Sequence, residues 1–232
     1  MTAKNPSVLI IDDNVDEARL GKRHLGKAGE VRVREPDDVS ERDLRSSSVV
    51  LIDYRLTDWA ARDQLESICL KPEDGIALAG VLRSYVHRHH GDRPVAFALY
   101  SGQLADLSPS HGPHLREHAI ARLNNLEWVF AKNEVPPGVT FAQQVTALAA
   151  AVRQLAKGSV VVKSRGLSNL KKLLSVPTAK WSRRALEDVE ECHPPHRDLA
   201  ADSRGLSLVR WMLHRILPYP CFLVDERYLA IE

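Results

Sequence analysis

The sequence predicts an α/β fold with a five-stranded parallel sheet, followed by a smaller and mostly α-helical domain. Residues 1–156 alternate short β-branched apolar runs with longer amphipathic stretches. This alternation is typical of βα units that build a parallel sheet covered by helices on both faces. Beyond Lys157 the pattern changes to helical stretches broken by prolines, without alternating strands. We therefore expect one domain in residues 1–156 and a second in residues 157–232.

The five predicted strands are short apolar runs. They are Ser7–Ile11, Val31–Val33, Val49–Ile52, Val95–Leu99 and Glu127–Phe130. The second run is the shortest, and the fifth is assigned partly from its place in the order. Because parallel strands need crossover connections, usually helices, we expect amphipathic segments between them.

Five amphipathic segments fit those connections and the end of the domain. They are Val15–Lys27, Asp38–Ser46, Asp74–Arg88, Pro113–Asn124 and Phe141–Lys157. Asp13 or Asn14 should cap the first helix, because short polar side chains accept hydrogen bonds from free N–H groups there. The second helix has little room and should be short. Residues Ala156–Ser164 are compatible with a linker or with a continuation of the last helix.

Three histidines, His87, His89 and His90, end the third predicted helix. Partly charged imidazoles suit the negative end of a helix dipole. We therefore expect a favourable electrostatic role for these residues rather than metal binding.

Composition excludes several classes of protein. With 232 residues, of which 44% are hydrophobic, the chain can bury a core and is not disordered. Cys69, Cys192 and Cys221 are widely spaced and form no CxxC pair, which favours a reducing compartment over a disulfide framework. The N-terminal apolar run has only four residues, too short for a signal peptide or a membrane span. We expect a cytoplasmic protein without membrane association.

The net charge of +2 is unevenly distributed. Residues 157–232 contain 13 Lys and Arg against 9 Asp and Glu, so this part is mildly basic. Nucleic-acid-binding domains usually concentrate more positive charge on one face, which makes this weak support for an anionic partner.

Polar side chains follow four of the predicted strands where each strand ends. Asp12 and Asp13 follow the first, Asp53 the third, Ser101 the fourth and Lys132 the fifth. Functional groups of an open parallel sheet gather at the carboxyl ends of its strands, so these five side chains should share one small volume. Three close carboxylates repel one another unless a cation lies among them, and oxygen ligands suit Mg²⁺.

This arrangement suits phosphoryl transfer. Mg²⁺ would bridge a carboxylate oxygen of Asp53 to an incoming phosphoryl oxygen, while Lys132 and the Ser101 hydroxyl hold the remaining oxygens. Phosphoryl transfer is catalysed mainly by positioning and charge neutralisation, so no further catalytic residue is required.

Four motifs, LIIDDN, LIDYRL, ALYSG and VFAKNE, together resemble the receiver domain of two-component response regulators over residues 5–156. The resemblance implies a flavodoxin-like five-stranded fold and an aspartyl phosphate on Asp53, with Ser101 and Lys132 completing the site. A histidine kinase or phosphotransfer protein would donate the phosphoryl group in a phosphorelay. The chain would then be a signalling phosphoprotein rather than an enzyme.

The same resemblance implies a Mg²⁺ site. Asp13, Asp53 and the backbone carbonyl of Arg55 would ligate the ion, and Asp12 would assist. These assignments come from the matched motifs, and their geometry is an expectation at this point.

Three departures from the receiver pattern stand out. Asp74-Gly75 follows the acceptor only after a 20-residue segment, Tyr54–Glu73, which is an insertion containing Trp59. This segment would shield the acceptor and slow acyl phosphate hydrolysis, bind a partner, or be an ordinary surface excursion. Val129 stands where receivers commonly carry an aromatic residue, and Asn133 where they carry a proline. We expect the output of the signal to differ from that of ordinary receivers.

Other interpretations of the acidic residues remain open. The aspartates would merely cap helices and loops, or the chain would be a degenerate receiver that acts as a docking module without phosphorylation. A Mg²⁺-dependent phosphatase or hydrolase on a similar scaffold normally has a second aspartate two residues after its nucleophile. That position is Arg55, which argues against this reaction.

A DNA-binding transcriptional regulator is the alternative suggested by Leu167–Asp188. This segment is compatible with a helix-turn-helix whose second helix carries Lys180, Arg183 and Arg184 and lies in the major groove. Arginine-rich amphipathic helices are more often solvated faces. We therefore favour protein interaction or dimerisation over DNA binding for residues 157–232.

The C-terminal part offers two further features. Cys192, His193 and His196 would need Cys221 or His214 to complete a zinc site of four ligands, and a proline-rich loop explains them more simply. The segment Leu206–Leu217 is strongly apolar and should form a helix that is covered by other helices, by the receiver or by a second copy of the chain.

Overall fold

The computed structural model of the chain describes residues 7–26, 29–59, 71–90, 93–107, 113–132, 138–162, 171, 178–180, 182–192 and 206–218. The chain divides into two compact units, Met1–Val152 and Arg153–Glu232. The domain boundary expected at residues 156 and 157 stays a prediction.

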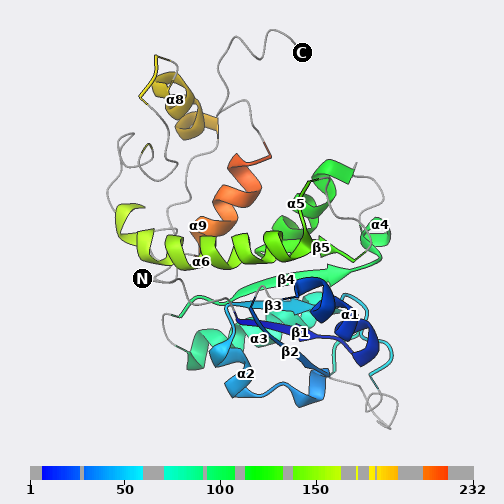
Figure 1. Cartoon of the computed structure of the whole chain (residues 1–232). Helices are drawn as coiled ribbons and strands as arrows, with labels where there is room; N and C mark the ends of the chain where they lie inside the picture. Colours follow the sequence, from blue (N-terminus) through cyan, green and yellow to red (C-terminus); the bar gives the residue numbers. More distant parts are fainter. Residues whose placement is uncertain are drawn as a thin grey trace. The chain divides into compact units, whose positions relative to one another are not determined.

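A five-stranded parallel sheet forms the centre of the first unit (Figure 1). Its strands are β1 (Ser7–Ile11), β2 (Glu30–Arg34), β3 (Val49–Ile52), β4 (Ala96–Ser101) and β5 (Trp128–Ala131). They lie in the order β2-β1-β3-β4-β5, and all neighbouring strands are parallel. This is the doubly wound, flavodoxin-like order, which reverses direction between β1 and β3. The predicted fold class is confirmed.

Helices cover both faces of this sheet. In chain order they are α1 (Val15–Leu25), the 3₁₀ helix η1 (Pro36–Asp38), α2 (Glu41–Ser46), α3 (Gly75–His89), α4 (Leu104–Leu107), α5 (Pro113–Leu123) and α6 (Phe141–Val162). Figure 1 shows α2 and α3 on one side of the sheet and the first part of α6 on the other. Parallel sheets need this double cover because both of their faces are apolar.

Alternate strand residues supply the two cores. Leu9 of β1 and Phe97 of β4 belong to the cluster that contains Leu44 of α2 and Leu78 of α3. On the opposite face, Tyr100 of β4 stacks on Phe141 of α6, with ring centroids 4.6 Å apart. The period-two alternation of strand side chains thus separates the two layers.

Short polar residues begin three of the helices. Asn14 caps α1 by accepting hydrogen bonds from the N–H groups of Asp16 and Glu17. Asp74 caps α3 through the Ala77 N–H at 2.8 Å. Ser40 opens α2 with a capping box. These side chains satisfy N–H groups that have no partner within the helix.

The observed bounds differ from the predicted ones in identifiable ways. α1 ends before Gly26, whose positive φ of 54° suits a glycine at a helix end. β4 runs two residues past the predicted end at Leu99, so Ser101 is the last residue of the strand rather than a residue beyond it. α6 continues to Val162, which shows that the stretch after Ala156 prolongs the helix. No predicted helix corresponds to α4.

The histidines at the end of α3 pack beside Tyr85. The ring centroids of His89 and His90 lie 4.5 and 5.8 Å from that of Tyr85. Burial, together with the nearby Arg45 cation, lowers the pKa of His90, because both disfavour the imidazolium form. The lowered pKa argues against the partly charged imidazole that the sequence predicts at His90.

The described part of the second unit is helical. It contains the end of α6, α8 (Ser182–Cys192), α9 (Leu206–Trp211) and a π-helical turn, η3 (Met212–Ile216). Leu206, Leu208, Trp211 and Ile216 are buried, which agrees with the apolar helix predicted for Leu206–Leu217. Residues 167–170 and 172–177 of the helix-turn-helix segment lie outside the described residues, as do His193, His196 and Cys221.

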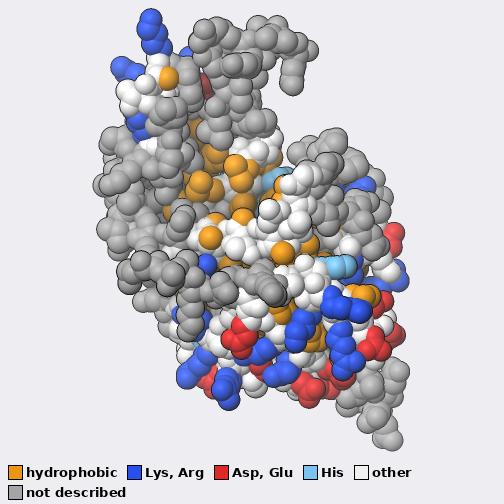
Figure 2. Space-filling model, viewed as in Figure 1, with side chains coloured by type: hydrophobic (Ala, Val, Ile, Leu, Met, Phe, Trp, Pro, Cys, Tyr) orange, Lys and Arg blue, Asp and Glu red, His pale blue; other side chains and the backbone are white. Residues whose placement is uncertain are grey.

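The surface carries both signs of charge. Figure 2 shows basic and acidic side chains interspersed over the part of the first unit where α1 and α2 lie in Figure 1. Among the described helices, none combines the length and the apolar character that crossing a bilayer requires.

Candidate functional site

The register of the central strands places the candidate residues along one edge of the sheet. Ile11 of β1 pairs with Ile52 of β3, so the residues that follow them, Asp12 and Asp53, are neighbours. Ser101 of β4 pairs with Ala131 of β5. The Lys132 N–H then donates to the Ser101 carbonyl at 2.9 Å, which continues the ladder by one residue.

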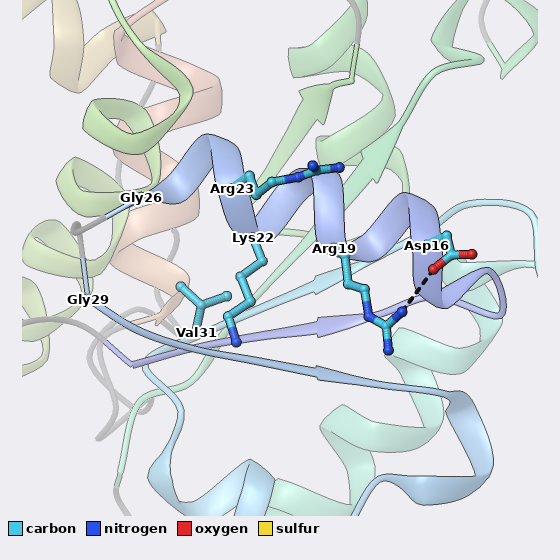
Figure 3. Close-up of a pocket in the computed structure, with 7 residues that line it drawn as sticks. All are labelled: Asp16, Arg19, Lys22, Arg23, Gly26, Gly29 and Val31. Carbon is cyan, nitrogen blue, oxygen red and sulfur yellow. Dashed lines mark hydrogen bonds and ion pairs between the residues drawn. The ribbon is translucent and has the colours of Figure 1, made fainter.

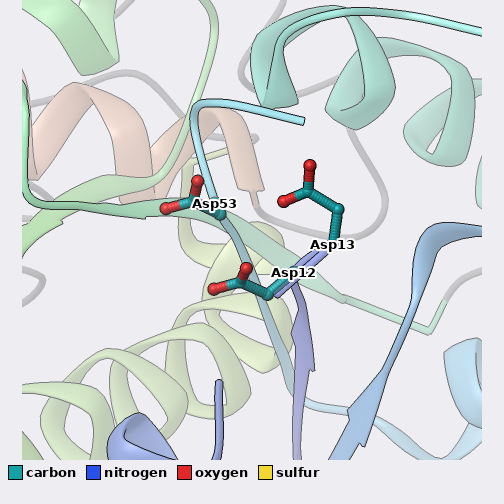
Figure 4. A group of neighbouring side chains, drawn as sticks. All are labelled: Asp12, Asp13 and Asp53. Atoms are coloured by element: carbon teal, nitrogen blue, oxygen red, sulfur yellow. The ribbon is translucent and has the colours of Figure 1, made fainter. Parts of the chain in front are cut away.

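Three carboxylates gather at the ends of β1 and β3 (Figure 4). One oxygen each from Asp12, Asp13 and Asp53 lies within 4.8 Å of the others. Asp12 is fully buried, whereas Asp13 and Asp53 are partly exposed. Like charges at this separation repel, so a cation among them lowers the cost of ionising all three.

Lys132 supplies one positive charge. Its Nζ lies 2.7 Å from Asp53 Oδ1, 3.1 Å from Asp12 Oδ2 and 3.1 Å from Glu17 Oε2. Burial disfavours the ammonium, but the hydrogen bond and charge of Asp53, with the charge of Asp12, outweigh it and raise the pKa of Lys132. Lys132 is therefore a permanent cation within the carboxylate cluster.

The two carboxyl groups after β1 are harder to ionise than ordinary aspartates. Burial raises the pKa of Asp12 to about 6, although the Lys132 cation and the Asn14 N–H at 2.9 Å oppose the shift. Burial also raises the pKa of Asp13, against the Asp58 N–H that donates to Asp13 Oδ2 at 2.6 Å. The ionised cluster thus has an energetic cost that a bound divalent cation would offset.

The backbone after Asp53 is fixed beside the carboxylates. The Arg55 N–H donates to Asp53 Oδ2 at 3.0 Å. Arg55 also forms an antiparallel bridge with Asp74. The Leu56 N–H donates to the Glu73 carbonyl, and the Gly75 N–H to the Tyr54 carbonyl. The backbone of Arg55, whose carbonyl is the candidate ligand, is therefore fixed by hydrogen bonds to Asp53 and to the segment before α3.

Ser101 is the last residue of β4, the strand next to β3, and lines the same site. It is buried, and its Oγ accepts a hydrogen bond from the Gln103 N–H at 3.1 Å. Since that bond uses an oxygen lone pair, the hydroxyl proton keeps its capacity to be donated.

A cavity of about 670 Å³ joins these groups. All six residues proposed from the sequence line it: Asp12, Asp13, Asp53, Arg55, Ser101 and Lys132. The structure thus brings the six together, while their chemical roles stay predictions. Oxygen atoms dominate the donor set, which fits a hard cation such as Mg²⁺.

Two contacts of the site were missed by sequence reasoning. Glu17 lies in the first turn of α1, close in sequence to the acidic pair, and this closeness could have indicated its contact with Lys132. The Asp58 N–H reaches Asp13 from 45 residues away. No periodic pattern in the sequence signals that contact.

Aromatic packing near the site differs from the receiver pattern. Val129 is buried in β5. Tyr100 instead lies beside the lysine, with Lys132 Nζ 5.7 Å from its ring centroid, and stacks on Phe141. The aromatic group next to the site therefore comes from β4.

A second hollow, of about 790 Å³, lies between α1 and the beginning of β2 (Figure 3). Arg19, Lys22 and Arg23 of α1 line it, and Figure 3 shows Lys22 extending toward β2 while Asp16 pairs with Arg19 at 2.9 Å. Its charged side chains are exposed. Exposed charges of this kind indicate a solvated surface rather than a built site.

Raising the pH through about 6 should destabilise the Mg²⁺-free chain through Asp12. Between pH 3.8 and about 6 the folded chain retains a proton on Asp12 that the unfolded chain has lost, so this contribution to stability disappears as the pH rises. The Asp12→Asn variant should therefore gain melting temperature relative to the native chain between pH 5 and 7.5, and Mg²⁺ should reduce that gain. Thermal unfolding followed by circular dichroism measures both effects. Parallel pH profiles of the two chains would contradict this prediction.

The comparisons with known proteins identify only distant structural likenesses. No family model matches the chain, and no curated protein matches it in sequence. The signal receiver domain of the response regulator NarL from Mycobacterium tuberculosis is 18% identical and has a TM-score of 0.39, covering 64% of this chain and 98% of that domain. A response regulator from Burkholderia pseudomallei with a phosphorylated aspartic acid is 12% identical over 91% of this chain and 98% of its own, with a TM-score of 0.36.

RcsB from Salmonella enterica serovar Typhimurium, bound to promoter DNA, is 14% identical over 90% of this chain and 98% of its own, with a TM-score of 0.33. All three TM-scores lie below 0.5. The fold of this chain is therefore assigned from its own strand order. Its resemblance to receiver domains rests on the residues that line its site.

Proposed function

We propose that this chain is a response regulator whose receiver domain, residues 1–156, accepts a phosphoryl group on Asp53 with Mg²⁺ bound beside it. The observation that carries the proposal is the contact of Lys132 Nζ with Asp53 Oδ1 at 2.7 Å, inside a cluster of three carboxylates. A carboxylate nucleophile, a fixed cation and a hard-ligand site are the parts that phosphoryl transfer requires.

Asp53 is the nucleophile in this proposal. One of its carboxylate oxygens bonds to phosphorus while the bond between phosphorus and the histidine nitrogen of the donor breaks, and an acyl phosphate results. The Arg55 N–H on Oδ2 orients the carboxylate. As negative charge develops on the phosphoryl group, the Lys132 ammonium donates to one phosphoryl oxygen and the Ser101 hydroxyl donates to another.

Asp12, Asp13, Asp53 and the Arg55 carbonyl are the groups that would hold Mg²⁺. When bound, the ion would neutralise the carboxylates and screen the incoming phosphoryl oxygens. Asp12 and Asp13 favour its binding because burial has made their own ionisation costly in the absence of a cation.

The donor would be a histidine kinase or phosphotransfer protein in the cytoplasm. Residues 157–232 would receive the signal as an interaction or dimerisation module, and a homodimer is the simplest assembly. α8 carries Arg183 and Arg184 but also four acidic side chains, and Arg183 is paired with Glu187 at 2.8 Å. These acids would repel DNA phosphates, so α8 does not favour the DNA-binding alternative.

Intact-mass analysis after incubation with acetyl phosphate tests the proposal. We expect a gain of one phosphoryl group in the native chain with Mg²⁺, none without Mg²⁺, and none in Asp53→Asn. Asp38→Asn, a change at an exposed aspartate of η1, is the matched control and should be phosphorylated like the native chain. If the native chain binds Mg²⁺ but gains no mass, a degenerate receiver used for docking becomes the better description.

A further inference from the structure

The inserted segment between the acceptor and α3 begins and ends close to the acidic site. Its described residues are 54–59 and 71–73. Leu56 is fully buried and Trp59 is only 8% exposed, and both belong to the core cluster of the sheet. The beginning of the insertion is therefore packed against the domain.

One carboxylate outside the insertion holds both of its described ends. Asp37 of η1 accepts a hydrogen bond from Trp59 Nε1 at 2.7 Å. Lys71 Nζ lies 2.9 and 2.8 Å from the two Asp37 oxygens and 4.8 Å from the centroid of the Trp59 ring. Asp37, Trp59 and Lys71 thus form a three-residue clasp at the ends of β2 and the insertion.

The clasp is directly connected to a candidate metal ligand. Asp58 precedes Trp59, and its N–H donates to Asp13 Oδ2 at 2.6 Å. Because the Trp59 side chain is fixed by Asp37 and by burial, the adjoining Asp58 peptide has little freedom to leave the Asp13 carboxylate. A continuous set of contacts therefore runs from Asp37 through Trp59 and Asp58 to Asp13.

We propose that Asp37 is a positioning residue of the metal site, which acts through Trp59 and the Asp58 N–H to orient the Asp13 carboxylate for Mg²⁺. The inference rests on the proposed function, because Asp13 is a ligand only if the receiver site binds the ion. A carboxylate whose second oxygen is already hydrogen-bonded loses less freedom when its first oxygen ligates a metal. The insertion would thereby help to orient a metal ligand instead of being an ordinary surface excursion.

Two substitutions weaken the clasp in different ways. Trp59→Phe keeps an aromatic ring but removes the N–H donor, at the cost of some core volume, whereas Asp37→Asn keeps an acceptor oxygen for Trp59 and removes the charge that attracts Lys71. Loss of an outer-shell partner commonly weakens metal binding 10- to 100-fold. Since Asp37 acts through intervening groups, we expect the Kd for Mg²⁺ to rise about tenfold in each variant. Asp38→Asn, next to Asp37 on the same exposed turn, should retain the native Kd.

Isothermal titration calorimetry with Mg²⁺ alone gives these Kd values, at a temperature well below the melting temperature of every variant. The exchange rate of the Asp58 amide hydrogen, measured by NMR in the Mg²⁺-free chain, reports the clasp separately. We expect slow exchange in the native chain and in Asp38→Asn, and faster exchange in Trp59→Phe and Asp37→Asn. A merely structural role would lower the melting temperature without changing the Kd.

Each other outcome overturns the inference. Faster exchange with an unchanged Kd would show that the clasp does not position Asp13. Unchanged exchange in both variants would show that Asp58 is not held through Asp37. A native chain that binds no Mg²⁺ would refute the metal site of the proposed function, and the inference with it, before any variant is compared.

Discussion

Replacing Lys132 with alanine is expected to slow phosphorylation of Asp53 by roughly 100-fold or more, because removal of one fixed group that stabilises developing charge typically costs 10²- to 10³-fold. Lys132 Nζ lies 2.7 Å from the acceptor oxygen and is held by Asp12 and Glu17 as well. Water that replaces the ammonium would have to reorganise as the charge moves onto the phosphoryl group. Time-resolved intact-mass analysis at saturating Mg²⁺ measures the rate constant.

The same substitution should tighten Mg²⁺ binding. A slower rate with tighter Mg²⁺ binding would show that the variant is still folded and still binds the ion. Lys132 and Mg²⁺ are attracted to the same carboxylates and repel each other, so removal of the lysine favours the ion. Lys22→Ala, at an exposed lysine of α1, is the matched control and should change neither quantity. If Mg²⁺ binding weakens along with the rate, the lysine acts mainly by keeping the site folded.

Replacing Gly75 with alanine should lower the free energy of unfolding by about 3 kcal/mol, the upper end of what overpacking usually costs. An alanine Cβ at this position would lie 2.0 Å from the Asp53 carbonyl oxygen and 2.9 Å from Ile52 Cγ2. The carbonyl belongs to the backbone of the acceptor and cannot rotate away like a flexible side chain. Either the start of α3 or the turn that carries Asp53 has to move. Urea unfolding gives the free energy.

Gly80 provides a control within the same helix. A Cβ there would meet nothing within 4 Å. Gly80→Ala should therefore stabilise the chain by about 0.5–1 kcal/mol, because alanine loses less conformational freedom than glycine in a helix interior. If both substitutions change the free energy of unfolding equally, the close approach of position 75 to Asp53 is not the reason why glycine is needed there.

Much of the sheet and its acidic edge could be predicted from the sequence because both depend on local patterns. Each apolar run sets one strand, and the order of parallel strands then brings Asp12, Asp53 and Lys132 to one edge. The exact ends were less predictable, since hydrogen bonding rather than apolarity extends β4 to Ser101.

The clasp and the Asp58 contact could not be predicted, for a different reason. Trp59 and Asp37 are 22 residues apart, and they meet only because the insertion folds back on η1. An inserted segment has no period that would fix which of its residues return to the site.

Because of the antiparallel bridge between Arg55 and Asp74, the position of Asp53 does not depend on how long the insertion is. The two segments of the chain are joined at this point, so the stretch between Arg55 and Asp74 is closed at its base whatever its length. Doubling the length of such a loop costs only about 0.6 kcal/mol in closure entropy. Homologous chains are therefore free to carry side loops of very different lengths here while Asp53 and the first turn of α3 keep their positions, and an alignment across this region should place its gaps between residues 60 and 70.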